Sequence, residues 1–209
     1  MPTGLTENRW VKSVEIVEVN DVDNEQGTGR DTVGGRYIFH HMIWGTADLD
    51  ENGERIPSTN TSWPVHEVGR NPDIFDPDGG RLLKAGTYIV SDSVHLHSNG
   101  KDTTGHLEIG FRFHEKGYEP KYERVNVGLG NGVDISIAGN QRDQELHAYS
   151  VLQQHTKIIT FEPHLHAPGE RMCLEAIWGY TIETLSCVGY DHNWVRGYGL
   201  RRRCHAIAA

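Results

Sequence analysis

The feature that most constrains this chain is an alternation of apolar and polar residues with a period of two. β-branched and aromatic residues take every second position in segments that Gly, Asn and Pro separate. Short strands at this spacing are typical of antiparallel sandwiches. We therefore predict an all-β fold. The expected strands cover residues 10–19, 36–44, 86–97, 105–114, 125–129, 133–137, 145–152, 157–166 and 171–178.

Length and breaker residues predict two domains. The 209 residues are enough for one large or two small β domains. A polar segment with a glycine and a proline, at 115–124, is the best candidate for the joint. We therefore place one domain at 8–118 and a second at 119–209. The stretch at 45–86 is longer than most loops, so it is either a functional loop or contains short strands.

Charge and hydropathy argue against two kinds of partner. The chain has 29 acidic and 20 basic side chains, and no Lys/Arg run before its last few residues. A nucleic acid or an anionic membrane is therefore a poor partner. No apolar stretch approaches the roughly 20 residues that a membrane helix needs. The start of the chain also lacks the apolar core of a secretion signal, so we expect no membrane span and no export signal.

Histidine is the unusual residue type. The chain has 13 copies, and imidazole is a common ligand of copper, zinc and iron. On two of the expected strands, His95 and His97 and likewise His164 and His166 lie opposite the apolar face. Side chains at i and i+2 of a strand can bind one ion together. Either each pair binds a metal, or His-X-His arises by chance in a histidine-rich chain.

The adjacent pair His40 and His41 needs a special backbone. Neighbours on a regular strand face opposite ways, so joint ligation would need a β-bulge or the end of the strand. Taken alone, the pair favours a structural role. Three further side chains either orient ligating imidazoles by hydrogen bonds or have ordinary surface roles. They are Asp102, His106 and Glu162.

Three runs of sequence together resemble a known family. They are FHHMIWG, VHLHSNGKDTTGHLEIGFRF and FEPHLHAPGERMCLEAIWG. In this order they are similar to the copper type II, ascorbate-dependent monooxygenases, the family of peptidylglycine α-hydroxylating monooxygenase and dopamine β-monooxygenase, and most similar to its bacterial members. The resemblance covers residues 8–196. It implies two jelly-roll-like antiparallel β-sandwich domains, each binding one copper ion, across a water-filled cleft.

The resemblance also implies the copper ligands and the reaction. The first copper, which supplies electrons, would be bound by His40, His41 and one histidine of the next pair, with His95 favoured over His97. The second copper, which binds oxygen, would be bound by His164, His166 and a methionine thioether. A thioether favours Cu(I), whereas imidazoles serve both oxidation states. The co-substrates would be O2 and a reductant such as ascorbate, and the substrate would be a peptide or a small molecule.

The end of the chain departs from the family pattern. The family's methionine ligand is expected well downstream on a later strand, but Met172 is the only methionine after Met42. Alternation assigns Met172 to the core, which leaves it a weak candidate ligand. From about residue 197 the tail acquires three consecutive arginines and no longer resembles the family. We expect that a frameshift shortened the second domain, which would make it marginally stable.

The cysteines and the location follow from the same resemblance. It implies a disulfide between Cys173 and Cys187, and two reduced buried thiols are the alternative. Cys204 is then left unpaired. The family resemblance suggests a periplasmic or secreted protein, and an oxidising compartment would favour the disulfide.

Three functions are compatible with these features. The first is a copper monooxygenase, or a degenerate relative, that hydroxylates a C–H bond. The second is a non-catalytic copper-binding or electron-transfer protein, which the missing methionine favours. The third is a cupin-like enzyme with one metal, because His164, His166 and Glu170 fit part of a cupin motif.

Overall fold

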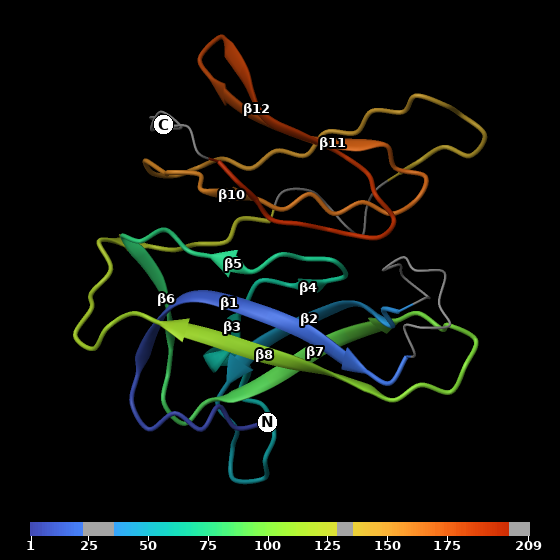
Figure 1. Cartoon of the computed structure of the whole chain (residues 1–209). Helices are drawn as coiled ribbons and strands as arrows, with labels where there is room; N and C mark the ends of the chain where they lie inside the picture. Colours follow the sequence, from blue (N-terminus) through green and yellow to red (C-terminus); the bar gives the residue numbers. More distant parts are fainter. Residues whose placement is uncertain (23–35, 129–135, 201–209) are drawn as a thin grey trace.

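The computed structural model of this chain describes residues 1–22, 36–128 and 136–200. Within them the regular elements are strands, apart from a 3-10 turn at Pro57–Thr59, which confirms the all-β prediction. The strands are β1 (Arg9–Asn20), β2 (Phe39–Ala47), β3 (Thr61–Ser62), β4 (His66–Glu67), β5 (Asp73–Ile74), β6 (Gly79–Leu83), β7 (Tyr88–Leu96), β8 (Gly105–Phe113), β9 (Tyr122–Glu123), β10 (Thr160–Phe161), β11 (Arg171–Trp178), β12 (Thr181–Gly189) and β13 (Tyr198–Gly199). Figure 1 shows two bodies, with β1 to β8 below and β10 to β12 above.

The N-terminal body is a sandwich whose two sheets are built around β1 and β2. Strand β1 pairs with β8 on one side and with β5 and β6 on the other, all antiparallel. Strand β2 pairs with β7 on one side and with β3 and β4 on the other, again antiparallel. The segment that leads to the C-terminal body begins with β9, which pairs in parallel with β6 of the N-terminal body.

The core of the N-terminal body lies between the two sheets. Val11 and Val14 of β1 and Trp44 of β2 are at most 2% exposed. Trp63 stacks on Trp44 with the ring centroids 5.7 Å apart, and Trp44 donates its indole N–H to the carbonyl oxygen of Pro64. Full burial of one such apolar side chain stabilises the fold by about 2 kcal/mol. The core thereby anchors β2, the strand on which His40 and His41 lie.

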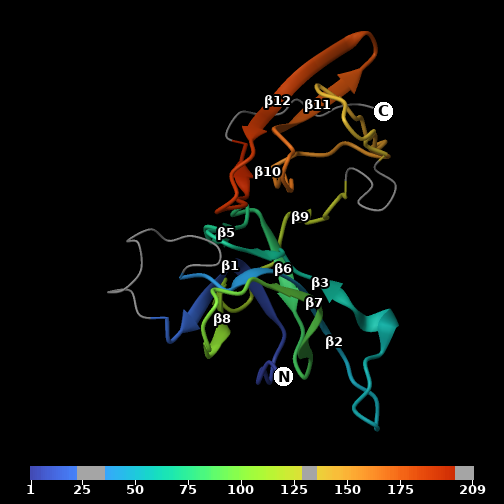
Figure 2. The same ribbon diagram turned by 90° about the vertical axis from the view of Figure 1, so that its right-hand side faces the viewer.

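The C-terminal body contains two small antiparallel sheets. Strand β10 pairs with β13, and β11 and β12 form a long hairpin that projects from the body in Figure 2. Leu174 and Ala176 of β11 are buried, and Met172 lies on the same side of the strand. Tyr180 and Ile182 of the hairpin are exposed. The side of β11 that alternation assigned to the core is therefore the buried side, although this body buries few apolar side chains.

Some of the strand predictions were wrong. Residues 125–128 and 145–152 form no strand, and the strand expected at 157–166 is reduced to the two residues of β10. Most apolar side chains of the first two segments are exposed. The strand expected at 133–137 falls mostly outside the described residues.

Other strands were missing from the sequence prediction. The stretch at 45–86 contains β3 to β6, which was one of the two alternatives for it. Most residues of strand β12 are exposed, and among the described strands it pairs with β11 alone. The arginine-rich end of the tail, with Cys204, lies outside the described residues. In the described part of the chain, no helix has the length and apolar character needed to cross a membrane.

Candidate metal centre

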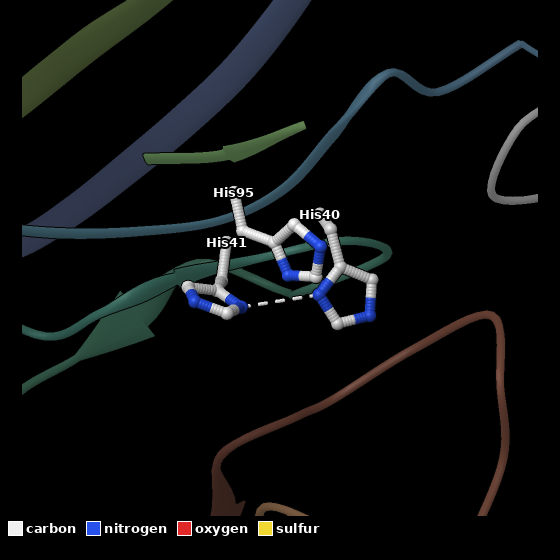
Figure 3. Close-up of side chains that lie close together, drawn as sticks. All are labelled: His40, His41 and His95. Atoms are coloured by element: carbon white, nitrogen blue, oxygen red, sulfur yellow. Dashed lines mark hydrogen bonds between the residues drawn. The ribbon is translucent and has the colours of Figure 1, made fainter. Parts of the chain in front are cut away.

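A β-bulge turns His40 and His41 toward each other. Phe39 pairs with Leu96 and His41 pairs with His95, so His40 is an extra residue in β2. The Nδ1 atoms of His40 and His41 are 3.1 Å apart, and Figure 3 shows their rings side by side with His95 next to them. This is the irregularity that the sequence required if adjacent histidines were to bind one ion.

His95 completes a first group of possible ligands. One nitrogen from each of His40, His41 and His95 can be chosen so that all three atoms lie within 4.8 Å of one another. His97 stacks on His40, with the ring centroids 4.7 Å apart, and is not a member of this group. The geometry therefore favours His95 over His97 as the third donor, which is also the residue that the resemblance favoured.

His164 and His166 approach each other after β10, not on a strand. Their Nε2 atoms are 2.9 Å apart. The extended segment ends in a turn in which the backbone N–H of Gly169 donates to the carbonyl oxygen of His166. The prediction that these histidines lie on a strand was wrong, because β10 ends at Phe161. The alternation of side chains in an extended segment still brings the two rings together.

The pair His40 and His41 meets the pair His164 and His166 at the boundary between the bodies. His41, His164 and His166 form a second group with donor atoms within 4.8 Å of one another. The rings of His41 and His164 are 5.7 Å apart between centroids, and those of His40 and His166 are 6.0 Å apart. We call His40, His41, His95, His97, His164 and His166 the histidine cluster. The cluster is continuous, whereas the resemblance implied two sites separated by a cleft.

Glu67 is a residue of this site that the sequence did not reveal. It lies on β4, which pairs with β2 so that Glu67 is opposite His41. Its carboxylate is 1% exposed, and Oε1 lies 2.7 Å from Nδ1 of His164. Glu67 belongs to a stretch without clear periodicity, and the contact spans 97 residues of sequence. No local pattern could have indicated it.

The environment of the cluster lowers the pKa of three of its six imidazoles. Burial, reinforced by His97 and the other rings, lowers the pKa of His40 to about 4. Burial likewise lowers the pKa of His41 and of His97. The hydrogen bond with Glu67 instead raises the pKa of His164. A neutral imidazole is the form that binds a metal, so the lowered pKa of His40 and His41 suits them as ligands at neutral pH.

The other predicted site residues lie in different surroundings. Glu162 accepts a hydrogen bond from Arg70, which also binds Asp73. His106 is exposed on β8 near Glu108, and Asp102 is exposed in the preceding loop. Within the described residues, no hydrogen bond joins any of these three predicted side chains to the histidine cluster. The disulfide between Cys173 and Cys187 is present and links β11 to β12.

A short segment that begins with the last residue of β4 holds the two bodies together. The buried guanidinium of Arg70 binds Glu162 of the C-terminal body, and the backbone N–H of Val195 donates to the carbonyl oxygen of Val68. Gly69 has φ +66°, and a Cβ atom there would lie 2.8 Å from Cβ of Trp194. We call residues 67–70 the bridging segment. Because it also contains Glu67, the contact between the bodies and the histidine cluster are parts of one structure.

The fold and the site define an all-β protein with histidine groups that could hold a metal ion. Imidazole nitrogens suit copper, zinc, iron and nickel, whereas magnesium and calcium prefer oxygen ligands. The donor set of the cluster therefore fits a first-row transition metal. No protein-family model, no curated protein and no solved structure matches this chain.

Proposed function

We propose that this chain is a copper-binding, monooxygenase-like protein that acts on a C–H bond with O2 and an external reductant. The observation that carries the proposal is the convergence of histidines from the two bodies into two groups of three donors. The sequence resemblance supplies the reaction class, and the clustered imidazoles supply ligands that suit it.

Copper is the metal that this donor set favours. In a given set of nitrogen ligands, Cu(II) binds more tightly than the other divalent ions of the first row. The neutral state of His40 and His41 at neutral pH removes competition by protons. Zinc has a similar preference for imidazole, so the metal content of the purified chain distinguishes the two ions.

The residues of the chain have separate tasks in this proposal. Bound copper would supply the one-electron chemistry that activates O2. Each group has one exposed ring, His95 in the first and His166 in the second, so both groups are open to solvent. Glu67 accepts a hydrogen bond from Nδ1–H of His164, so that Nε2 of this ring is the atom that would bind the ion.

A second candidate is a copper protein without catalysis. One observation favours it: His41 belongs to both groups of donors, so the arrangement seen here does not give each ion three ligands of its own. Such a protein would bind or pass on copper without forming a hydroxylated product.

Copper titration with spectroscopy tests the proposal. We expect the His40→Ala/His41→Ala and the His164→Ala/His166→Ala variants each to lose part of the copper that the wild-type chain binds. Full wild-type copper content in both variants would contradict the proposal. Ascorbate and O2 are then added to the copper-loaded chain with panels of peptides and aromatic amines. Reductant-dependent product, absent from the zinc-loaded chain, supports the monooxygenase, and its absence across the panels favours the non-catalytic protein.

A further inference from the structure

The contacts of the bridging segment place a carboxylate behind one metal ligand. The geometry points to a metal site that spans the two bodies, with His41, His164 and His166 as ligands and Glu67 as the positioning residue for His164. This inference rests on the proposed function only in that the histidine cluster binds a metal. It adds which histidines act together and which residue orients them.

The tautomer of His164 follows from its partner. An ionised carboxylate only accepts hydrogen bonds, so His164 Nδ1, which is 2.7 Å from Glu67 Oε1, carries a proton. In the neutral ring Nε2 then has the lone pair. This atom faces Nε2 of His166 at 2.9 Å. At this distance the two nitrogens share a hydrogen bond when His166 carries a proton on Nε2, and once that proton is lost both lone pairs can bind one ion, with His41 as the third donor.

The buried state of Glu67 is an independent observation that points to a cation. Its side chain is 1% exposed, and its second oxygen, Oε2, has no hydrogen-bond partner among the residues that the structure describes. A buried carboxylate is unfavourable unless positive charge lies close to it. A divalent ion on the far side of the His164 ring would supply that charge through the imidazole. Metal-bound histidines commonly donate their other N–H to a carboxylate in this way.

The site has a consequence for the arrangement of the bodies. His41 lies on β2 in the N-terminal body, whereas His164 and His166 follow β10 in the C-terminal body. One ion bound by all three is a link between the bodies beside the bridging segment. Metal binding should therefore protect the hydrogen bond from the N–H of Val195 to the oxygen of Val68, which joins the same two bodies.

Zinc titration combined with hydrogen exchange tests this inference on the full chain. Zn(II) has no redox chemistry, so the result is independent of any oxygenase activity. We expect zinc to slow exchange around Val195 in the wild type. The His95→Ala variant leaves His41, His164 and His166 in place, so it should keep this protection. The His41→Ala variant should lose it. Wild-type protection in His41→Ala would overturn the inference.

The role of Glu67 is tested by matched carboxylate variants. We expect Glu67→Gln to weaken the zinc affinity of the site formed by His41, His164 and His166 about 10-fold, since a neutral amide polarises the His164 ring less than a carboxylate does. Glu67→Asp should restore part of that affinity. The control is Glu162→Gln, a carboxylate between the same bodies that binds Arg70. Wild-type affinity in Glu67→Gln, or an equal loss in Glu162→Gln, would contradict the positioning role, and a Glu67 variant that does not fold leaves the His41 comparison decisive.

Discussion

His66 is a buried histidine outside the proposed ligand groups. It is 6% exposed, and in the described part of the chain neither ring nitrogen has a hydrogen-bond partner. Burial, with a smaller contribution from Arg70 and His41, lowers the pKa of His66 to about 4. The ring is therefore neutral in the folded chain at pH 5, while in the unfolded chain most of it is protonated. This difference in protonation lowers the free energy of unfolding only at acidic pH.

The pH dependence of stability should reveal His66. As the pH falls from 7 to 5, the unfolded chain takes up a proton that folded His66 does not, so the free energy of unfolding falls by about 2 kcal/mol from this residue. We expect the His66→Leu variant to lose less stability over this range than the wild type. Urea unfolding at both pH values measures the difference. Equal losses in the two proteins would show that His66 titrates normally.

At the scale of single strands, the bulge in β2 shows what sequence reasoning can reach. The pair His40 and His41 indicated that a bulge was needed, and the pairing of β2 with β7 contains it. A second irregularity lies between Ile43 and Trp44, and beyond it Ser93 to Leu96 of β7 are exposed on both faces, Val94 and Leu96 included. Alternation alone could not predict this, because it marks the apolar face of a strand and not whether another layer covers that face.

The β11–β12 hairpin should depend on its disulfide. Cys173 and Cys187 are cross-strand partners separated by 14 residues, and few apolar side chains of the hairpin are buried. The Cys173→Ser/Cys187→Ser variant should lose about 3 kcal/mol of stability in the C-terminal body, since the bridge restricts the unfolded chain. Hydrogen exchange of β11 and β12 measures the loss. The wild type under reducing conditions should behave like the variant, and unchanged exchange in both would refute the expectation.

At the scale of the whole molecule, Gly69 decides how closely the bodies approach. Its φ of +66° is unfavourable for other residues, and an added Cβ would lie 2.8 Å from Cβ of Trp194 and 2.9 Å from the carbonyl oxygen of Asn193. Both contacts are with the C-terminal body. A side chain at this position therefore strains the backbone and pushes the bodies apart.

Substitution of Gly69 tests this closeness. We expect Gly69→Ala to destabilise the chain by roughly 2 kcal/mol and to weaken the zinc affinity of the group formed by His41, His164 and His166. Gly86→Ala is the matched control, because Gly86 has φ +75° and no atom of the described residues lies within 4 Å of an added Cβ. It should share the backbone strain and keep the metal affinity. Isothermal calorimetry with zinc compares them, and equal affinities would argue against close contact between the bodies.

Much of the site could be predicted from sequence, but its assembly could not. The histidine pairs, the preference for His95 and the disulfide partners were all indicated by local pattern or resemblance. The contact of Glu67 with His164 was not, because these residues are 97 positions apart and no periodicity marks either as a partner. Glu162 looked like a suitable partner from its place near His164, yet it binds Arg70.

The sequence by itself determined that this chain forms β-strands and that histidines gather in pairs, because alternation and i, i+2 spacing are local properties of an extended backbone. Only the tertiary structure decided that the pairs meet in one cluster with His41 in common. That outcome depends on how two bodies pack against the bridging segment. Packing of this kind arises from contacts between distant residues, such as Gly69 with Trp194, which no short stretch of sequence encodes.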